Sequence, residues 1–198
     1  ITSSAKKDKF IYPFEGLPHT GTIILLPYRN DTSRKDALPA VKNYIEVIKA
    51  VSKYETVFIG IDNQVYEKYY LMVKDIKNTK ILRLNYDDAW ARDNTPLFVI
   101  NSREIRAVNF SFNAWGGHFD GLYSNWDKDL KLSHEIALKL DLDYYTIPDF
   151  ILEGGSISNN GEGTLITTKA CLLSQGRNSH LSQEEIEDVL KDHLNIGK

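Results

Sequence analysis

The chain has 198 residues and a formal net charge of -3, with 42% hydrophobic and 26% charged residues. This length fits one ordinary domain or part of a larger one. The slightly acidic charge argues against binding to nucleic acid or to an anionic membrane. The single cysteine, Cys171, excludes a disulfide framework and a cysteine-rich zinc site within these residues. We expect neither a metal nor another cofactor.

No apolar run reaches the roughly 20 residues that a membrane-spanning helix needs, and no secretory signal is visible. One unpaired cysteine suits a reducing compartment, so we expect a cytoplasmic protein. The sequence starts at Ile1 rather than at Met. We therefore expect the natural start to lie upstream, and we expect Ile1–Lys9 to be a loose polar end.

The first half of the chain alternates short apolar strands with helices. Three strands are expected because their residues are apolar or β-branched: 21–26, 56–61 and 81–84. Between them, Pro39 opens a helix whose apolar residues recur at helical spacing as far as Val51. A second helix is expected over 64–72.

The second half begins with two strands, 97–100 and 105–110, joined by a hairpin turn. We then expect a helix near 130–140. Three further strands are expected: 144–147, 150–157 and 165–168. Ser182 and Glu185 have the spacing of a capping box, which predicts a helix running to about Leu194. The alternation indicates an α/β fold, and its loose recurrence suggests a repeated module.

Polar and glycine-rich stretches follow several of these strands. The loop Asp87–Pro96 holds three acids, an arginine and Trp90 between two strands, where a rigid scaffold can aim them. Phe112–Gly117 and Glu153–Gly155 close other apolar runs in the same way. The alternative for the first loop is a solvated acidic turn with Trp90 as a neighbouring core residue.

Asp93 and Glu153 each stand where an apolar strand ends. Two carboxylates in a partly dry pocket can do acid–base work or hold a cation. A planar guanidinium matches carboxylates bidentately, and Trp90 and Trp115 offer flat faces to such a cation. The glycines after Trp115 and Glu153 would allow backbone to approach a ligand closely. A guanidine-like small molecule is the most specific ligand prediction, and Arg92 is expected to pair with neighbouring acids.

Five stretches, taken together and in order, resemble agmatine deiminase, in the branch of guanidino-group-modifying enzymes that includes bacterial peptidylarginine deiminases. The resemblance covers the chain from about Pro13 onward. The matching stretches are DDAWARD (87–93), FSFNAWGG (110–117), DFILEGGS (149–156), GEGT (161–164), and CLL (171–173) with GRN (176–178).

The resemblance implies a fold class and a domain organisation. The family fold is a five-bladed α/β propeller, or pentein, built of strand–strand–helix–strand modules around a central active site. Residues 1–198 then form the N-terminal portion of a single deiminase propeller domain, which is a partial propeller. We expect this portion to self-associate as a homo-oligomer or to pair with the missing C-terminal part.

The resemblance also implies a reaction. Agmatine deiminases hydrolyse agmatine to N-carbamoylputrescine and ammonia through a cysteine thiouronium intermediate, in polyamine metabolism leading to putrescine. The matched motifs make Asp93 and Glu153 the catalytic carboxylates that bind the guanidinium, and Trp90 a residue that lines the pocket. The substrate-binding candidates of the second motif are Asn113, Trp115, Gly116 and Gly117.

The family's nucleophilic cysteine and its acid–base histidine lie in stretches that this sequence lacks. Cys171 aligns with a non-catalytic position in an apolar turn, where a small buried residue is expected. We therefore expect this chain alone to be inactive. The alternatives are a truncated, non-catalytic homologue that acts only as a binding or interaction module, and a deiminase for peptidylarginine or free arginine.

Overall fold

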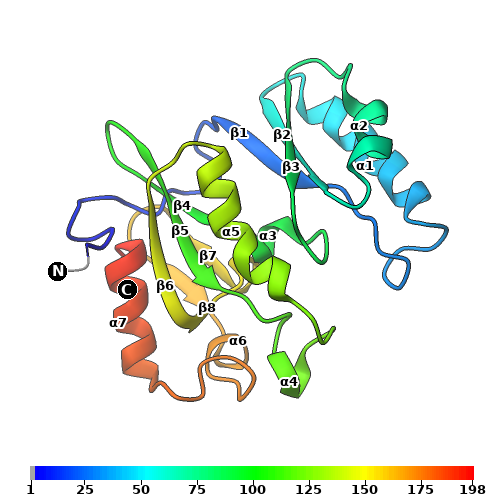
Figure 1. The fold of residues 1–198 in the computed structure, drawn as a ribbon. Helices are drawn as coiled ribbons and strands as arrows, with labels where there is room; N and C mark the ends of the chain where they lie inside the picture. Colours follow the sequence, from blue (N-terminus) through cyan, green and yellow to red (C-terminus); the bar gives the residue numbers. More distant parts are fainter. Residues whose placement is uncertain (1–2) are drawn as a thin grey trace. The chain divides into compact units, whose positions relative to one another are not determined.

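The computed structural model describes residues 3–198, and it has a mixed α/β fold (Figure 1). Contacts divide the chain into two compact units. We call Pro18–Ala91 the parallel-sheet unit, and the residues up to Leu17 together with Arg92–Lys198 the mixed-sheet unit. The predicted α/β class is confirmed.

The parallel-sheet unit has three parallel strands in the order β1 (Gly21–Leu25), β2 (Thr56–Asp62) and β3 (Thr79–Leu84). Two crossover helices, α1 (Leu38–Val51) and α2 (Tyr66–Val73), connect them. Alternate residues of β2 point to one face because side chains in a strand have a period of two. That face packs in one core with both helices, through Val57, Ile59, Ile61, Val41, Ile45, Ile48, Tyr69 and Val73. The three strands and two helices predicted for this region are confirmed.

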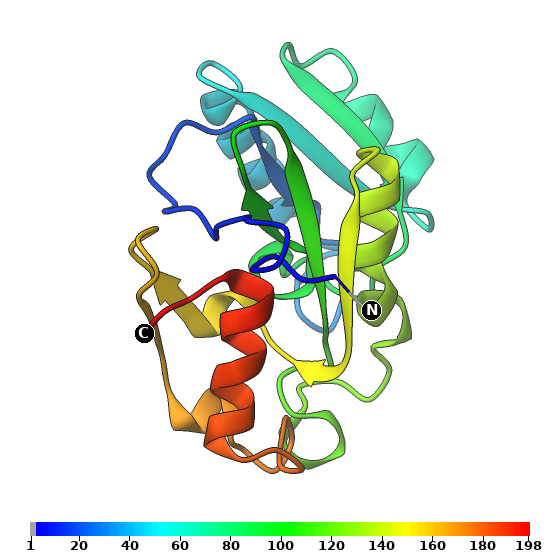
Figure 2. The same ribbon diagram turned by 90° about the vertical axis from the view of Figure 1, so that its left-hand side faces the viewer.

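The mixed-sheet unit contains one complete strand–strand–helix–strand module. β4 (Leu97–Ile100) and β5 (Ile105–Ser111) form the predicted antiparallel hairpin. Helix α5 (Asp127–Lys139) then returns the chain to β6 (Tyr144–Ile151), which runs parallel to β5. Helix α7 (Gln183–Leu194) packs its hydrophobic residues against one face of this sheet, and α5, whose Leu132, Ile136 and Ala137 are buried, lies on the other (Figure 2).

A second hairpin follows, made of β7 (Ile157–Asn159) and β8 (Leu165–Thr167). The short helix α6 (Lys169–Leu172) and then α7 come after it. The predicted capping box opens α7. The Glu185 N–H donates to the Ser182 hydroxyl at 3.2 Å, and the Ser182 N–H donates to the Glu185 carboxylate at 2.7 Å. These two bonds satisfy backbone donors that the first turn of a helix leaves without partners.

Two predictions about local structure are wrong. Residues 150–157 do not form one strand, because β6 ends at Ile151 and the 3-10 turn η1 (Gly154–Ser156) separates it from β7. Residues 87–96 are not all loop, because Ala91–Asn94 form a single helical turn, α3. Both departures lie at predicted site residues, and the contact that accompanies the 3-10 turn is described below.

The N-terminal residues are more ordered than the sequence predicts. Ser4, Ala5 and Phe10 are buried in the mixed-sheet unit. The Asp8 carboxylate accepts hydrogen bonds from Arg106 at 3.0 Å and from the Tyr145 hydroxyl at 2.6 Å. The prediction of a loose end is therefore wrong from Ser4 onward, and residues 1–2 lie outside the described part of the chain. Over residues 3–198, no helix combines the length and apolar character needed to cross a bilayer.

Candidate active site

The Asp93 carboxylate sits on α3 and is held by two hydrogen-bond donors. Its Oδ1 atom accepts the backbone N–H of Gly155 at 2.9 Å, and the side chain of Trp115 donates a further hydrogen bond. Burial raises the pKa of Asp93 above its ordinary value, and these hydrogen bonds oppose that rise without cancelling it. An ionised Asp93 would therefore gain from an additional positive partner.

A side chain at position 155 would disturb this contact. A Cβ atom at position 155 would collide with Oδ1 of Asp93, and one at position 154 would collide with the Arg92 carbonyl oxygen. The sequence predicts that these glycines admit a ligand, whereas in the structure the space beside Gly155 is taken by Asp93. The close approach also accounts for the 3-10 turn, because a continuous strand would not present the Gly155 N–H to α3.

Glu153 lies directly before this turn, with its side chain 2% exposed, and forms an ion pair with Arg177. The Arg177 Nε atom donates to Glu153 Oε1 at 3.0 Å. Burial raises the pKa of Glu153, the Arg177 charge lowers it, and the negative charge of Asp93 raises it further. The net effect is a raised pKa. The fold therefore brings Asp93 and Glu153 into one electrostatic environment although 60 positions separate them in sequence.

The loop that carries Trp115 has an unusual backbone. Ala114 and Trp115 both have left-handed conformations, with φ of 55° and 67°, and Gly117 follows at 59°. Such conformations are costly for residues with a side chain and are concentrated at functional sites. The Trp115 ring packs edge-on against Phe112 and Tyr123, with centroid distances of 5.2 and 6.1 Å. This packing fixes the ring that donates to Asp93.

Asn113, Gly116 and Gly117 shape this loop from within. The Asn113 side chain accepts the N–H of Gly116 at 3.1 Å and donates to the carbonyl of Gly176 at 2.7 Å. The Gly117 N–H donates to the Asn113 carbonyl at 2.8 Å, and Gly117 opens the short helix α4 (Gly117–Asp120). These bonds engage their polar groups inside the protein, and direct substrate contact by these three residues stays a prediction.

Trp90 belongs to the parallel-sheet unit, and its placement at a substrate pocket stays a prediction. Its indole N–H donates to Asp88 at 2.9 Å, and Asp88 also accepts the Ala89 N–H at 2.8 Å. Asp88 is buried, whereas Trp90 is 47% exposed. The buried carboxylate thus holds the edge of an indole ring whose surface is half accessible. Sequence reasoning assigned no role to Asp88, although an acid two residues before a tryptophan was visible.

Sequence reasoning also missed Arg177 and Asn178. Both belong to the GRN stretch at 176–178, so the resemblance contained the signal, but nothing in the sequence paired Arg177 with Glu153. Asn178 is fully buried and accepts the Ile151 N–H at 2.8 Å. It donates to the carbonyls of Ile151 and Leu172 at 2.9 and 3.1 Å. Two of these bonds join the segment before α7 to the end of β6, and the third joins it to α6.

Arg92, Cys171 and His134 lie outside this arrangement. Arg92 pairs with Glu15, in keeping with a structural role. Cys171 lies on α6 and packs half-buried against the core of the mixed-sheet unit. His134 is exposed on α5, not part of its apolar face, and its ring packs edge-on against Tyr144 at a centroid distance of 4.7 Å. Within residues 3–198, no group of three or more His, Cys, Asp or Glu residues could hold a metal ion.

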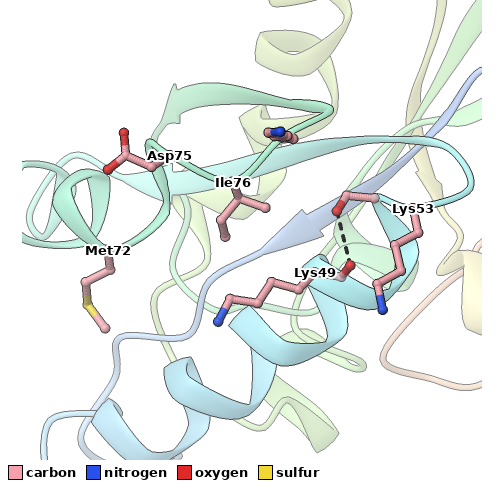
Figure 3. Close-up of a pocket in the computed structure, with 7 residues that line it drawn as sticks. Lys49, Lys53, Met72, Asp75 and Ile76 are labelled. Carbon is pink, nitrogen blue, oxygen red and sulfur yellow. Dashed lines mark hydrogen bonds between the residues drawn. The ribbon is translucent and has the colours of Figure 1, made fainter.

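A pocket of about 610 Å³ lies in the parallel-sheet unit, between the end of α1 and the segment that leaves α2 (Figure 3). Its lining includes three lysines, Lys49, Lys53 and Lys77, against one acid, Asp75. An excess of positive charge disfavours a guanidinium cation. The pocket contains none of the predicted site residues, so the candidate site is the carboxylate pair.

Comparison with known proteins agrees with the resemblance. The sequence profile of the Porphyromonas-type peptidyl-arginine deiminases matches residues 11–198. A Listeria monocytogenes serotype 4b protein, provisionally named agmatine deiminase 1, is 45% identical over 199 residues, covering 100% of this chain and 54% of its own length. The agmatine deiminase of Ectopseudomonas mendocina is 42% identical, covering 99% of this chain and 53% of its own length.

Solved structures give the same result. The agmatine deiminase of Enterococcus faecalis, captured catalysing its reaction, superimposes with a TM-score of 0.95 at 38% identity. That match covers 100% of this chain and 54% of the other. The chain thus spans about half the length of the relatives it matches. Because the family profile matches residues 11–198 and the fold agrees, the chain belongs to the Porphyromonas-type peptidyl-arginine deiminase family.

Proposed function

We propose that the chain is the N-terminal portion of an agmatine deiminase and that it supplies the carboxylates that bind the substrate guanidinium. The observation that carries this proposal is the closeness of Asp93 to the Glu153 segment, shown by the Gly155 N–H that donates to Asp93 at 2.9 Å. Burial raises the pKa of both carboxyl groups, and the Asp93 charge raises that of Glu153 further, so ionising both has a cost. A cation placed between them would remove that cost. A planar guanidinium can donate to both carboxylates at once, which an ammonium cannot do as well.

In the proposed reaction, Asp93 and Glu153 bind the guanidinium nitrogens and orient the central carbon for attack. Trp115 keeps Asp93 in place through its hydrogen bond. A cysteine thiolate and a histidine, both outside these 198 residues, would attack the carbon and move protons. Ammonia leaves, and water releases N-carbamoylputrescine from the thiouronium. Neither a metal nor a cofactor is needed, and the compartment is the cytoplasm.

Two alternatives remain as proposals. The chain could act alone as a non-catalytic binding module, or the complete protein could act on peptidylarginine or free arginine. The names of the relatives favour agmatine. Agmatine, free arginine and peptidylarginine differ in the groups beyond the guanidinium. None of the candidate residues in this chain is proposed to bind those groups.

The test of the function begins with the coding sequence beyond Lys198. We expect it to encode the cysteine and histidine stretches of the family, and we expect the complete protein to release ammonia and N-carbamoylputrescine from agmatine. Free arginine and a peptidylarginine are the comparison substrates. A stop codon directly after Lys198 would support the binding-module alternative. Faster turnover of free arginine or of the peptidylarginine would make that compound, rather than agmatine, the proposed substrate.

We also propose that the modules belong to a five-bladed propeller. The second hairpin and α7 repeat the first three elements of the module formed by β4, β5, α5 and β6. The residues after α7 already lie along β8, since Lys198 N–H donates to Gly163 and Lys198 O accepts from Leu165, both at 2.9 Å. This alternation is the hydrogen-bond pattern of a parallel strand pair. A further strand along β8 would make the second module like the first.

The chain by itself should therefore expose surface that the rest of a propeller would cover. Ile166, on β8, is 71% exposed, and an uncovered strand edge invites pairing with other chains. We expect concentration-dependent self-association in sedimentation velocity, together with binding of a hydrophobic dye. Ile166→Thr should reduce both without unfolding the chain, because the side chain is already in solvent. A dye-negative monomer at all concentrations would argue that this half of the fold closes by itself.

A further inference from the structure

Arg177 is a largely buried cation inside the proposed cation site. Its side chain is 13% exposed, and it pairs with Glu153, which is 2% exposed. Removing two charges from water is expensive, so a buried ion pair is weak evidence for stability. Such a pair can instead serve function. Because the Arg177–Glu153 pair lies beside Asp93, we expect that function to be substrate binding.

The backbone on both sides of Arg177 is anchored. On one side, the Gly176 carbonyl accepts from Asn113 at 2.7 Å, and a Cβ atom at position 176 would collide with Gly116. On the other side, Asn178 makes its three buried hydrogen bonds. The guanidinium is additionally steadied by Ser174, whose hydroxyl lies 3.4 Å from Nη1. The Trp115 loop and the end of β6 thus hold Arg177 in a defined position.

The contact with Glu153 engages one oxygen. Arg177 donates through Nε to Oε1, rather than through the two-bond fork that fully occupies a carboxylate. The Oε2 atom therefore lies outside this hydrogen bond. The Glu153 carboxylate also accepts a hydrogen bond from its own backbone N–H. Arg177 itself leaves the second oxygen of this carboxylate for another guanidinium.

The net charge around Asp93 and Glu153 also favours the binding of a cation. The charged groups that act on Glu153 are Asp93, from α3, and Arg177, from the segment before α7. The charge of Arg92, next to Asp93, lowers the pKa of Asp93, but Arg92 is itself ion-paired with Glu15, so these two charges cancel in the count. Two carboxylates and one guanidinium leave one negative charge uncompensated. A singly charged guanidinium substrate would balance it.

We propose that Arg177 is the positioning residue of the guanidine site: it pairs with one oxygen of Glu153, fixes the orientation of that carboxylate, and leaves the other oxygen for the substrate. This inference rests on the proposed function. The competing explanation of the same contact is that Arg177 occupies the place of the substrate guanidinium and must be displaced before the substrate binds.

The ionisation of Glu153 is the direct readout, and it can be measured on this chain without substrate. Carbon-13 NMR of labelled glutamate carboxyls, with the resonance assigned by Glu153→Gln, follows its titration. Arg177→Gln should raise the pKa of Glu153, because burial and the Asp93 charge then act without the opposing cation. Arg177→Lys keeps the charge and should leave the pKa of Glu153 near that of the parent. Arg103→Gln, an exposed arginine of the same unit, is the control and should change nothing.

Agmatine binding or turnover by the complete protein provides the second readout. Arg177→Gln should lose at least ~10-fold in kcat/KM near neutral pH and recover part of that loss as the pH rises, because Glu153 is then ionised again. A merely structural role would give a loss independent of pH. Thermal unfolding checks that each variant folds. If Arg177→Gln does not fold, the pKa of Glu153 and the turnover are compared between Arg177→Lys and the parent protein.

An unchanged pKa of Glu153 in Arg177→Gln, or a raised one in Arg177→Lys, would overturn the proposal. So would tighter agmatine binding by Arg177→Gln, which is the outcome expected if the arginine competes with the substrate. Failure of the complete protein to act on agmatine would count against the proposed function instead. The titration of Glu153 would still decide what Arg177 does.

Discussion

Asp93→Asn should lower kcat/KM of the complete enzyme for agmatine at least ~10-fold. A charge-assisted hydrogen bond is worth ~1.5–3 kcal/mol, and each ~1.4 kcal/mol is a factor of ten in rate. The substitution preserves shape but removes the charge that pairs with the guanidinium. It also turns one acceptor into a donor in a site where Gly155 N–H and the Trp115 side chain both donate to the carboxylate. The measurement is steady-state ammonia release.

Glu153→Gln should have an effect of similar size, since it removes the second carboxylate and leaves buried Arg177 without its charged partner. Thermal unfolding of both variants separates loss of function from loss of fold. Asp87→Asn is the matched control, because it lies in the same loop region and is expected to cost much less. Equal losses in all three variants would mean that the site does not depend on Asp93 and Glu153.

The isolated chain should release no ammonia from agmatine above background. In the proposed reaction a cysteine thiolate and an acid–base histidine perform the chemistry, and removing a nucleophile from an enzyme typically costs several orders of magnitude in kcat. The stretches that carry these two residues do not occur in the sequence. Carbamoylputrescine formation by the purified chain is the measurement, and the complete protein is the positive control.

Cys171→Ala provides the internal control for that experiment. Cys171 packs against the core on α6, and its backbone N–H donates to Thr168 at 3.2 Å. We expect the substitution to leave the inactive chain inactive. Turnover by the chain at the rate of a complete deiminase, abolished by Cys171→Ala, would make this cysteine a nucleophile and would overturn its assignment as a structural residue.

Sequence alone determined the elements whose causes are local. The capping box of Ser182 and Glu185 places the start of α7 through two hydrogen bonds within four residues. Pro39 and the helical spacing of Val41, Ile45 and Ile48 determine α1 in the same manner. The hairpin of β4 and β5 follows from two apolar runs and a short turn. Each of these patterns needs no information from distant residues.

The tertiary structure decided the features that depend on distant partners. The strand expected over 150–157 is broken because the Gly155 N–H donates to Asp93, 62 positions away in sequence. The N-terminal segment is ordered because Asp8 meets Arg106 and Tyr145. Hydrophobic periodicity carries no signal for either contact, since both join polar groups across the fold.

The candidate site divides in the same way. The types and order of its motifs, including Asp93 and Glu153, were visible in the sequence and in its family resemblance. The partner of each carboxylate was not: Asp93 is held by the backbone of the Glu153 segment, and Glu153 by Arg177, 24 positions later. A carboxylate in a loop is compatible with many partners. Only the folded chain selects one, because burial makes an unpaired charge too costly to keep.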